Sequence, residues 1–102
     1  MLLFFSKKGR PMLDTQIPIQ NSDFKLEQFD DEILLYSVTD TRAIYLNNTA
    51  FLVYGMCGSG QSVGEIISLL EEAYPDQQET IRADVTAALE QLGQIGALTL
   101  DD

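Results

Sequence analysis

The chain has 102 residues, of which 45% are hydrophobic and 22% are charged, a composition typical of one small globular domain. It contains no histidine and a single cysteine, which excludes an internal disulfide, a histidine-based catalytic triad and the usual zinc sites. The formal net charge of −10 disfavours nucleic-acid binding, because an acidic surface repels phosphate backbones.

The N-terminal segment differs in charge from the rest of the chain. Residues 1–10 carry three basic residues and no acid, although the first five are apolar. Basic residues that follow a short apolar run are in the wrong order for a secretory signal, and five residues cannot span a bilayer. We therefore expect a cytoplasmic protein without membrane association, with a flexible arm over residues 1–22 and one domain over residues 23–100. Alternatively, the arm docks on a partner or on a second copy.

Three short strands are predicted next. Phe24–Phe29 alternates apolar and polar residues, as a half-buried strand does. Glu32–Val38 is almost continuously apolar and is predicted to be the central strand, and Arg42–Leu46 is rich in strand-forming residues. The links between them are rich in aspartate and threonine, which favour tight turns. The pattern predicts a three-stranded antiparallel meander.

Three helices are predicted to follow the strands. Asn47 or Asn48 is a natural N-cap for the first helix, which Gly58 should end. The second begins with a capping box, in which Ser62 stands three residues before Glu65. Its apolar residues then recur at helical spacing until Pro75: Val63, Ile66, Ile67, Leu70, Ala73 and Tyr74.

The third helix shows a similar start, because Asp76 precedes Glu79 by three residues. Its apolar face consists of Ile81, Val85, Ala88, Leu89 and Leu92. A short extended tail is predicted over residues 97–100. Strands grouped before helices favour an α+β fold, with the helices on one face of the sheet. Cys57 lies in an apolar run and is expected to be a buried structural thiol.

Three stretches of this pattern resemble the PqqD family. They are Leu46-Asn47 at the strand-to-helix junction, Ser62-Val63-Gly64-Glu65-Ile66 at the start of the second helix, and Asp84-Val85 followed by Leu89, Leu92 and Gly96-Ala97-Leu98. The resemblance covers residues 24–100. The chain departs from the family where Cys57-Gly58-Ser59-Gly60 replaces the common Asp-Gly of the loop after the first helix.

The resemblance implies a winged helix-turn-helix without enzymatic activity, cofactor or metal. Such domains are peptide-recognition elements, which bind the leader of a ribosomally synthesised precursor peptide (RiPP). They present it to a separate modifying enzyme, often a radical S-adenosylmethionine (radical SAM) protein. In the name-giving case the pathway makes the cofactor PQQ, and another peptide-maturation pathway is equally open for this chain.

The resemblance also implies where the peptide binds, beside the third strand and against the third helix. An unpaired strand edge without proline is a template for β-augmentation. The predicted peptide-binding residues are Arg42, Ala43, Ile44, Tyr45 and Leu46 on the strand and Ile81, Asp84, Val85 and Ala88 on the helix. Alternatively, Ile81 and Val85 are core residues and Tyr45 is an ordinary exposed aromatic residue.

Three rival functions stay open. A DNA-binding protein of this fold would present Arg82 alone among acids on its third helix, whereas base and phosphate recognition needs several cations. An enzyme would have to use acidic runs such as Asp30-Asp31-Glu32 or Glu71-Glu72, and adjacent carboxylates are usually solvated. The third rival is an adaptor that binds a folded partner enzyme and no peptide. The oligomeric state, a homodimer included, also stays open.

Overall fold

The computed structural model describes residues 12–101, which form antiparallel strands followed by three helices. The elements in chain order are β2 (Ile17–Gln20), β3 (Phe24–Phe29), β4 (Glu32–Ser37), β5 (Ala43–Leu46), α1 (Asn48–Met56), α2 (Val63–Ala73), the 3₁₀ turn η2 (Pro75–Gln77), α3 (Gln78–Gln94) and β6 (Leu98–Asp101). The predicted α+β class and the predicted meander are confirmed. The winged helix-turn-helix description stays a prediction.

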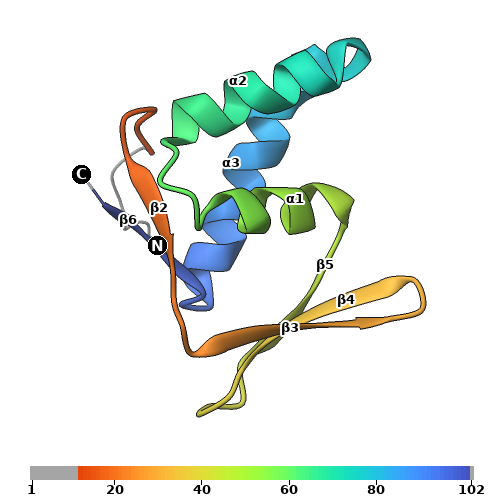
Figure 1. Ribbon diagram of the computed structural model, residues 1–102, viewed down its shortest axis with the longest axis vertical. Helices are drawn as coiled ribbons and strands as arrows, with labels where there is room; N and C mark the ends of the chain where they lie inside the picture. Colours follow the sequence, from red (N-terminus) through yellow and green to blue (C-terminus); the bar gives the residue numbers. More distant parts are fainter. Residues whose placement is uncertain (1–11, 102) are drawn as a thin grey trace, which may run out of the picture.

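β4 is the central strand of the meander, as its apolar character predicted, because the strand order is β3-β4-β5. Both pairings are antiparallel, with Leu35 opposite Leu26 of β3 on one side and opposite Ile44 of β5 on the other. Alternate residues of β4, Ile33, Leu35 and Ser37, are buried, so one face of the sheet packs on the core. The hairpin β3–β4 projects from the body of the molecule (Figure 1).

Before the meander, the described residues include the strand β2, which lies within the expected flexible arm over residues 1–22 and corrects that expectation for this part of it. β2 pairs antiparallel with β6, and Pro18 opposite Leu100 is among the fully buried residues. The two strands lie beside α3, away from the hairpin (Figure 1). Sequence reasoning missed this pair because β2 has only four residues and contains a proline, and its partner lies about 80 residues further along the chain. Residues 1–11 of the expected arm lie outside the described residues.

The core is built around α3, which contacts α1, α2 and β6. All five residues predicted for its apolar face are buried: Ile81, Val85, Ala88, Leu89 and Leu92. They meet the buried residues Val63, Ile66, Ile67 and Leu70 of α2, which were predicted in the same way. Helical spacing therefore identified the buried faces of α2 and α3, except that Ala73 and Tyr74, predicted for the α2 face, are exposed.

Two of the three predicted helix caps are confirmed. The Asn47 side chain accepts a hydrogen bond from the Ala50 amide at 2.8 Å, and Ser62 and Glu65 form the complete capping box. The third cap is wrong, because Asp76 lies inside the η2 turn and α3 begins after Gln77 without a side-chain cap. Pro75 fixes its own φ in the helical range and so starts a turn of 3₁₀ helix ahead of the expected N-cap.

The residues before β2 complete the N-terminus of α2. The Gly64 amide donates to the carbonyl of Asp14 and the Val63 amide to that of Gln16, at 2.9 and 2.8 Å. The Arg82 guanidinium of α3 makes two bonds with the Asp14 carboxylate, at 2.9 and 3.0 Å. These bonds lower the pKa of Asp14. This segment therefore holds α2 and α3 together, and the single arginine of α3 is engaged.

No helix within residues 12–101 is long and apolar enough to cross a membrane.

The capping box yields a stability prediction. Ser62→Ala removes the acceptor for the Glu65 amide and should lower the free energy of unfolding by about 1 kcal/mol. Ser68→Ala is the matched control, because Ser68 is exposed within the same helix and alanine is the better helix former. Urea titration of the two variants measures both effects. Equal stability of the two variants would contradict the role of the cap.

Candidate functional site

The outer edge of β5 is the first component of the candidate site. The Ser37 amide donates to the Arg42 carbonyl at 2.9 Å, and the register continues with Leu35 opposite Ile44. Hydrogen-bonded pairs alternate along an antiparallel ladder, so Ile44 and Leu46 direct their backbone groups toward β4. Ala43 and Tyr45 therefore direct theirs outward, where the described part of the chain supplies no further strand.

The side chains of β5 divide between the two faces of the sheet. Leu46 is buried and Ile44 is half-buried against the core, whereas Ala43 and Tyr45 lie on the outer face. Tyr45 is 61% exposed beside its cross-strand partner Leu34. The edge thus offers two outward backbone positions whose own side chains point away from the core.

A cavity of about 130 Å³ lies between the start of α1 and α3. Its lining residues are Asn47, Thr49, Ala50, Asp84, Ala87, Ala88 and Gln91. Asp84 is exposed and Ala88 is 7% exposed, and these two predicted site residues of α3 line the cavity together with Asn47, which follows β5. Ile81 and Val85 are 4% and 0% exposed and belong to the core, and neither lines this cavity.

Sequence reasoning missed the other positions of this cavity. The pattern predicts Asn47 only as a helix cap, and it assigns no site role to Thr49, Ala87 or Gln91. Ala87 and Gln91 follow Asp84 by three and seven residues, which is one helical face. The sequence signal that could have identified these positions is this run of small and polar residues along one face of the third helix.

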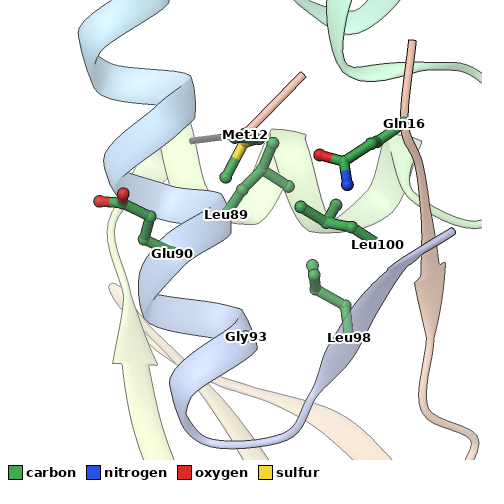
Figure 2. Close-up of a pocket in the computed structure, with 7 residues that line it drawn as sticks. All are labelled: Met12, Gln16, Leu89, Glu90, Gly93, Leu98 and Leu100. Carbon is green, nitrogen blue, oxygen red and sulfur yellow. The ribbon is translucent and has the colours of Figure 1, made fainter. Parts of the chain in front are cut away.

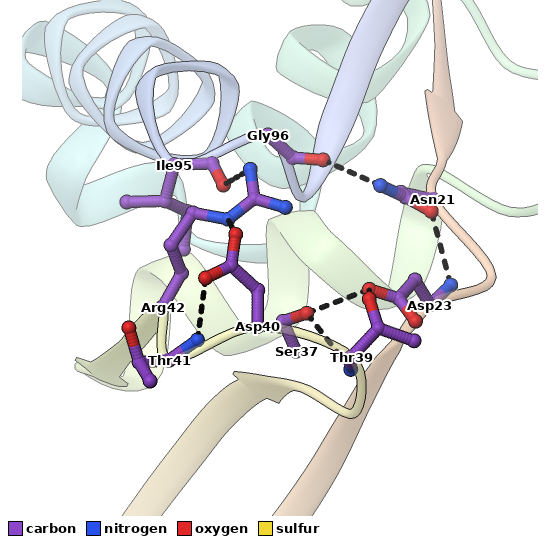
Figure 3. A network of polar contacts seen from close by, with 9 residues as sticks. All are labelled: Asn21, Asp23, Ser37, Thr39, Asp40, Thr41, Arg42, Ile95 and Gly96. Atoms are coloured by element: carbon purple, nitrogen blue, oxygen red, sulfur yellow. Dashed lines mark hydrogen bonds and ion pairs between the residues drawn. The ribbon is translucent and has the colours of Figure 1, made fainter.

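Arg42 lies directly before β5, and its side chain is occupied within the protein (Figure 3). Its Nη1 donates to the Ile95 carbonyl at 2.7 Å, and its Nε lies 3.0 Å from the Asp40 carboxylate. The guanidinium also stands over the ring of Phe24, with 5.3 Å to the centroid. Arg42 therefore connects the start of β5 to the end of α3.

The turn beside Arg42 is held by a second set of polar contacts (Figure 3). The hydroxyls of Ser37 and Thr39 donate to the Asp23 carboxylate at 2.6 and 2.7 Å and lower its pKa. The resulting stabilisation is present above the pKa of Asp23 in the unfolded chain and is lost as the pH falls through the lowered value. The Asn21 amide group donates to the Gly96 carbonyl at 3.0 Å, which connects this turn to the end of α3.

A larger cavity of about 340 Å³ lies on another side of α3, toward β6 (Figure 2). Met12, Leu89, Leu98 and Leu100 supply apolar surface there, and Glu90 is the charged residue of its lining. A lone carboxylate among apolar side chains has no second group for acid–base chemistry. We place no site in this cavity, because the described chain begins at its rim.

Side chains that could bind a metal ion or act as nucleophiles are scarce elsewhere in the described residues. Within residues 12–101, no cluster of three or more metal-ligating acidic, cysteine or histidine side chains is found. Cys57 is 2% exposed and its thiol donates to the Val53 carbonyl at 3.1 Å, so the predicted buried thiol is confirmed. Burial raises the pKa of Cys57 to about 12, which keeps it protonated at neutral pH.

Comparison with known proteins gives the family of the chain. The family model described as "Coenzyme PQQ synthesis protein D (PqqD)" matches residues 32–98, which is more than half of the sequence. The chain belongs to the PqqD family. The match begins at β4 and runs through α3 to the first residue of β6, so it includes both β5 and the α3 cavity. Neither the curated proteins nor the solved structures gave a match.

The contact between Arg42 and Gly96 yields a second prediction. Gly96 has φ +84°, and a Cβ at this position would collide with Nη1 of Arg42. Gly96→Ala should therefore lower the free energy of unfolding by about 1–2 kcal/mol. Gly55→Ala is the control, because it lies in α1 with open space around it and should stabilise by about 0.5–1 kcal/mol. Thermal unfolding of both variants checks the opposite signs.

The environment of Cys57 yields a third prediction. Its raised pKa and burial should make alkylation by iodoacetamide at pH 8 far slower in the folded protein than in denaturant. Mass spectrometry over time measures the two rates. Equal rates would show that the thiol is accessible in the folded state.

Proposed function

We propose that this PqqD-family protein binds the leader segment of a ribosomally synthesised precursor peptide as an added strand on β5. It then presents the peptide to a separate modifying enzyme, a radical SAM protein or another tailoring enzyme. The observation that carries the proposal is the open edge of β5, with outward backbone groups at Ala43 and Tyr45. The α3 cavity includes Asn47, the residue that follows β5. An added strand gains affinity from its backbone and specificity from pockets for alternate side chains.

The chemistry of the chain supports a binding role in place of catalysis. The sequence has no histidine, and its one thiol is buried and protonated. The family description names a protein of coenzyme PQQ synthesis, which supports a role beside enzymes of a biosynthetic pathway. In this role the protein supplies orientation and local concentration, and the partner enzyme supplies the reaction.

The charges of α3 argue against the DNA-binding alternative. Arg82 is held in a two-bond contact by Asp14, and Arg42 is held by Asp40 and the Ile95 carbonyl. Among residues 12–101 this leaves Lys25 as the cation outside these ion pairs. A surface with so few available cations and a net charge of −10 does not suit a phosphate backbone.

The outward amide of Tyr45 is the basis for testing strand addition. Tyr45→Pro removes that amide without removing a bond to β4, and proline is tolerated on an edge strand. Loss of this backbone hydrogen bond should weaken leader binding by up to about tenfold. The measurement is titration of the full-length protein with the leader peptide encoded beside its gene, followed by amide chemical shifts.

Two control variants distinguish the effect of losing the Tyr45 amide from the effects of losing its ring and of placing a proline on a strand edge. Gln28→Pro places proline on the opposite edge, where the same alternation directs the Gln28 amide outward, and it should leave affinity unchanged. Tyr45→Ala keeps the amide and removes only the exposed ring. If Tyr45→Pro folds and binds like the wild type, or if residues 41–46 show no shifts at saturation, strand addition is wrong and the adaptor alternative gains support.

A further inference from the structure

A second cavity on α3 is not accounted for by strand addition on β5. It measures about 230 Å³ and lies where α1, the end of α2, η2 and the start of α3 meet. Leu70 and Ile81, 6% and 4% exposed, form its floor. Leu52 and Tyr74, 39% and 43% exposed, stand on its rim. Two large apolar side chains are thus left partly in water around one hollow.

The exposure of Tyr74 has a local cause. Its spacing continues the apolar face of α2, yet it lies at the C-cap of the helix with φ −129° and ψ 69°. Pro75 then turns the chain into η2, which directs Tyr74 out of the helical pattern. The ring therefore borders the cavity instead of filling the core.

The cavity continues the proposed peptide site. Thr49 lines both this cavity and the smaller one next to β5, and Ile81 and Asp84 are three residues apart on α3. Three helical residues rise about 4.5 Å along the axis. Alternate residues of an extended peptide point to the same side and are separated by about 6.6 Å. One peptide segment that leaves the Leu46 end of β5 can therefore reach both hollows.

The two hollows differ in the side chains that would suit them. The Leu52–Tyr74 cavity has no charged residue in its lining, and it is smaller than the roughly 300–1,000 Å³ typical of small-molecule sites. It suits one apolar side chain. In the hollow beside β5, Asp84 is the one charged lining residue, and it has no ion pair within residues 12–101. It suits a lysine or arginine.

We propose that the protein selects peptides with a basic residue opposite Asp84 and an apolar residue about two positions away, seated between Leu52 and Tyr74. This inference rests on the proposed function and adds a specificity rule to it. In such a peptide the basic residue would form an ion pair that fixes the register, and burial of the apolar residue would add affinity. Strand pairing alone is tolerant of sequence, because it uses only backbone groups.

The test uses a displayed library of short random peptides selected on the full-length protein. The selected pool should be enriched in a lysine or arginine two positions from a leucine, isoleucine, valine or phenylalanine. Synthetic peptides from the pool should bind Leu52→Gln about tenfold more weakly, because the apolar contact is lost. They should bind Asp84→Lys about fivefold more weakly, and selection on that variant should favour an acidic residue at the basic position.

Matched controls lie at similar but unrelated positions. Leu69→Gln changes a leucine of α2 that is 42% exposed and does not line the cavity, and Glu90→Lys reverses a charge of α3 in a different cavity. Both should bind pool peptides within about twofold of the wild type. A pool without the basic–apolar pair, or pool peptides that bind Leu52→Gln and Asp84→Lys as tightly as the wild type, would overturn the specificity rule.

The Tyr45→Pro variant shows whether a negative result refutes only the specificity rule or the proposed strand addition as well. Pool peptides weakened by Tyr45→Pro but not by Leu52→Gln or Asp84→Lys would retain strand addition and refute the specificity rule alone. If no peptide is enriched, or if Tyr45→Pro has no effect on pool peptides, strand addition fails and the specificity rule fails with it.

Discussion

The backbone hydrogen bond between the Ser37 amide and the Arg42 carbonyl sets the register of the β4–β5 pairing, and the candidate site depends on that register. An antiparallel ladder bonds alternate residues to each neighbour, so the register decides which groups of β5 remain unpaired. A slip of one residue would direct Ile44 outward and turn the side chains of β5 to the opposite faces. The same register keeps Leu46 in the core, so core packing and the open edge are decided together.

Arg42 supports this arrangement through its side chain. It bridges the start of β5 to the carbonyl of Ile95 at the end of α3, and Gly96 leaves the space that the guanidinium occupies. The polar contacts of Asp23 with Ser37 and Thr39 stabilise the adjoining turn. The separation between the β5 edge and α3 is therefore set at one end by charged and backbone groups. Apolar packing sets it at the other end, where Leu46 meets the core.

The surface of α3 shows how one helix divides structural and binding roles. Residues at one set of helical positions, Val85 and Leu89 among them, are completely or almost completely buried. Neighbouring positions at Asp84, Ala87 and Gln91 face a hollow that the core does not fill. The helical faces toward the core and toward the hollow are adjacent. Spacing alone therefore does not show whether an apolar residue at their boundary packs in the core or lines the hollow. Ile81 shows this, since it is buried in the core and still forms the floor of the second cavity.

The sequence by itself determined the features that depend on neighbouring residues. Alternation identified β3, nearly continuous apolar character identified β4, and strand-forming residues identified β5. The Ser62–Glu65 spacing identified the start of α2, and helical spacing identified the buried face of α3. The order of the family-like stretches is a property of the sequence alone, and it indicated the PqqD family that the family match shows. The predicted start of α3 was wrong because Pro75 begins a 3₁₀ turn that includes Asp76. The local sequence pattern does not show whether the proline or the aspartate cap decides where the helix starts.

Only the tertiary structure decided the features that depend on distant residues. The pairing of β2 with β6 joins segments about 80 residues apart, and no local pattern encodes which partner a short strand finds. The hydrogen bonds from Arg42 to the Ile95 carbonyl and from Arg82 to the Asp14 carboxylate likewise depend on where distant segments meet α3. The hollow that Leu52 and Tyr74 border likewise exists only because residues of α1, α2, η2 and α3 come together there. Local patterns specify elements and their buried faces, whereas packing between elements decides which surfaces stay open.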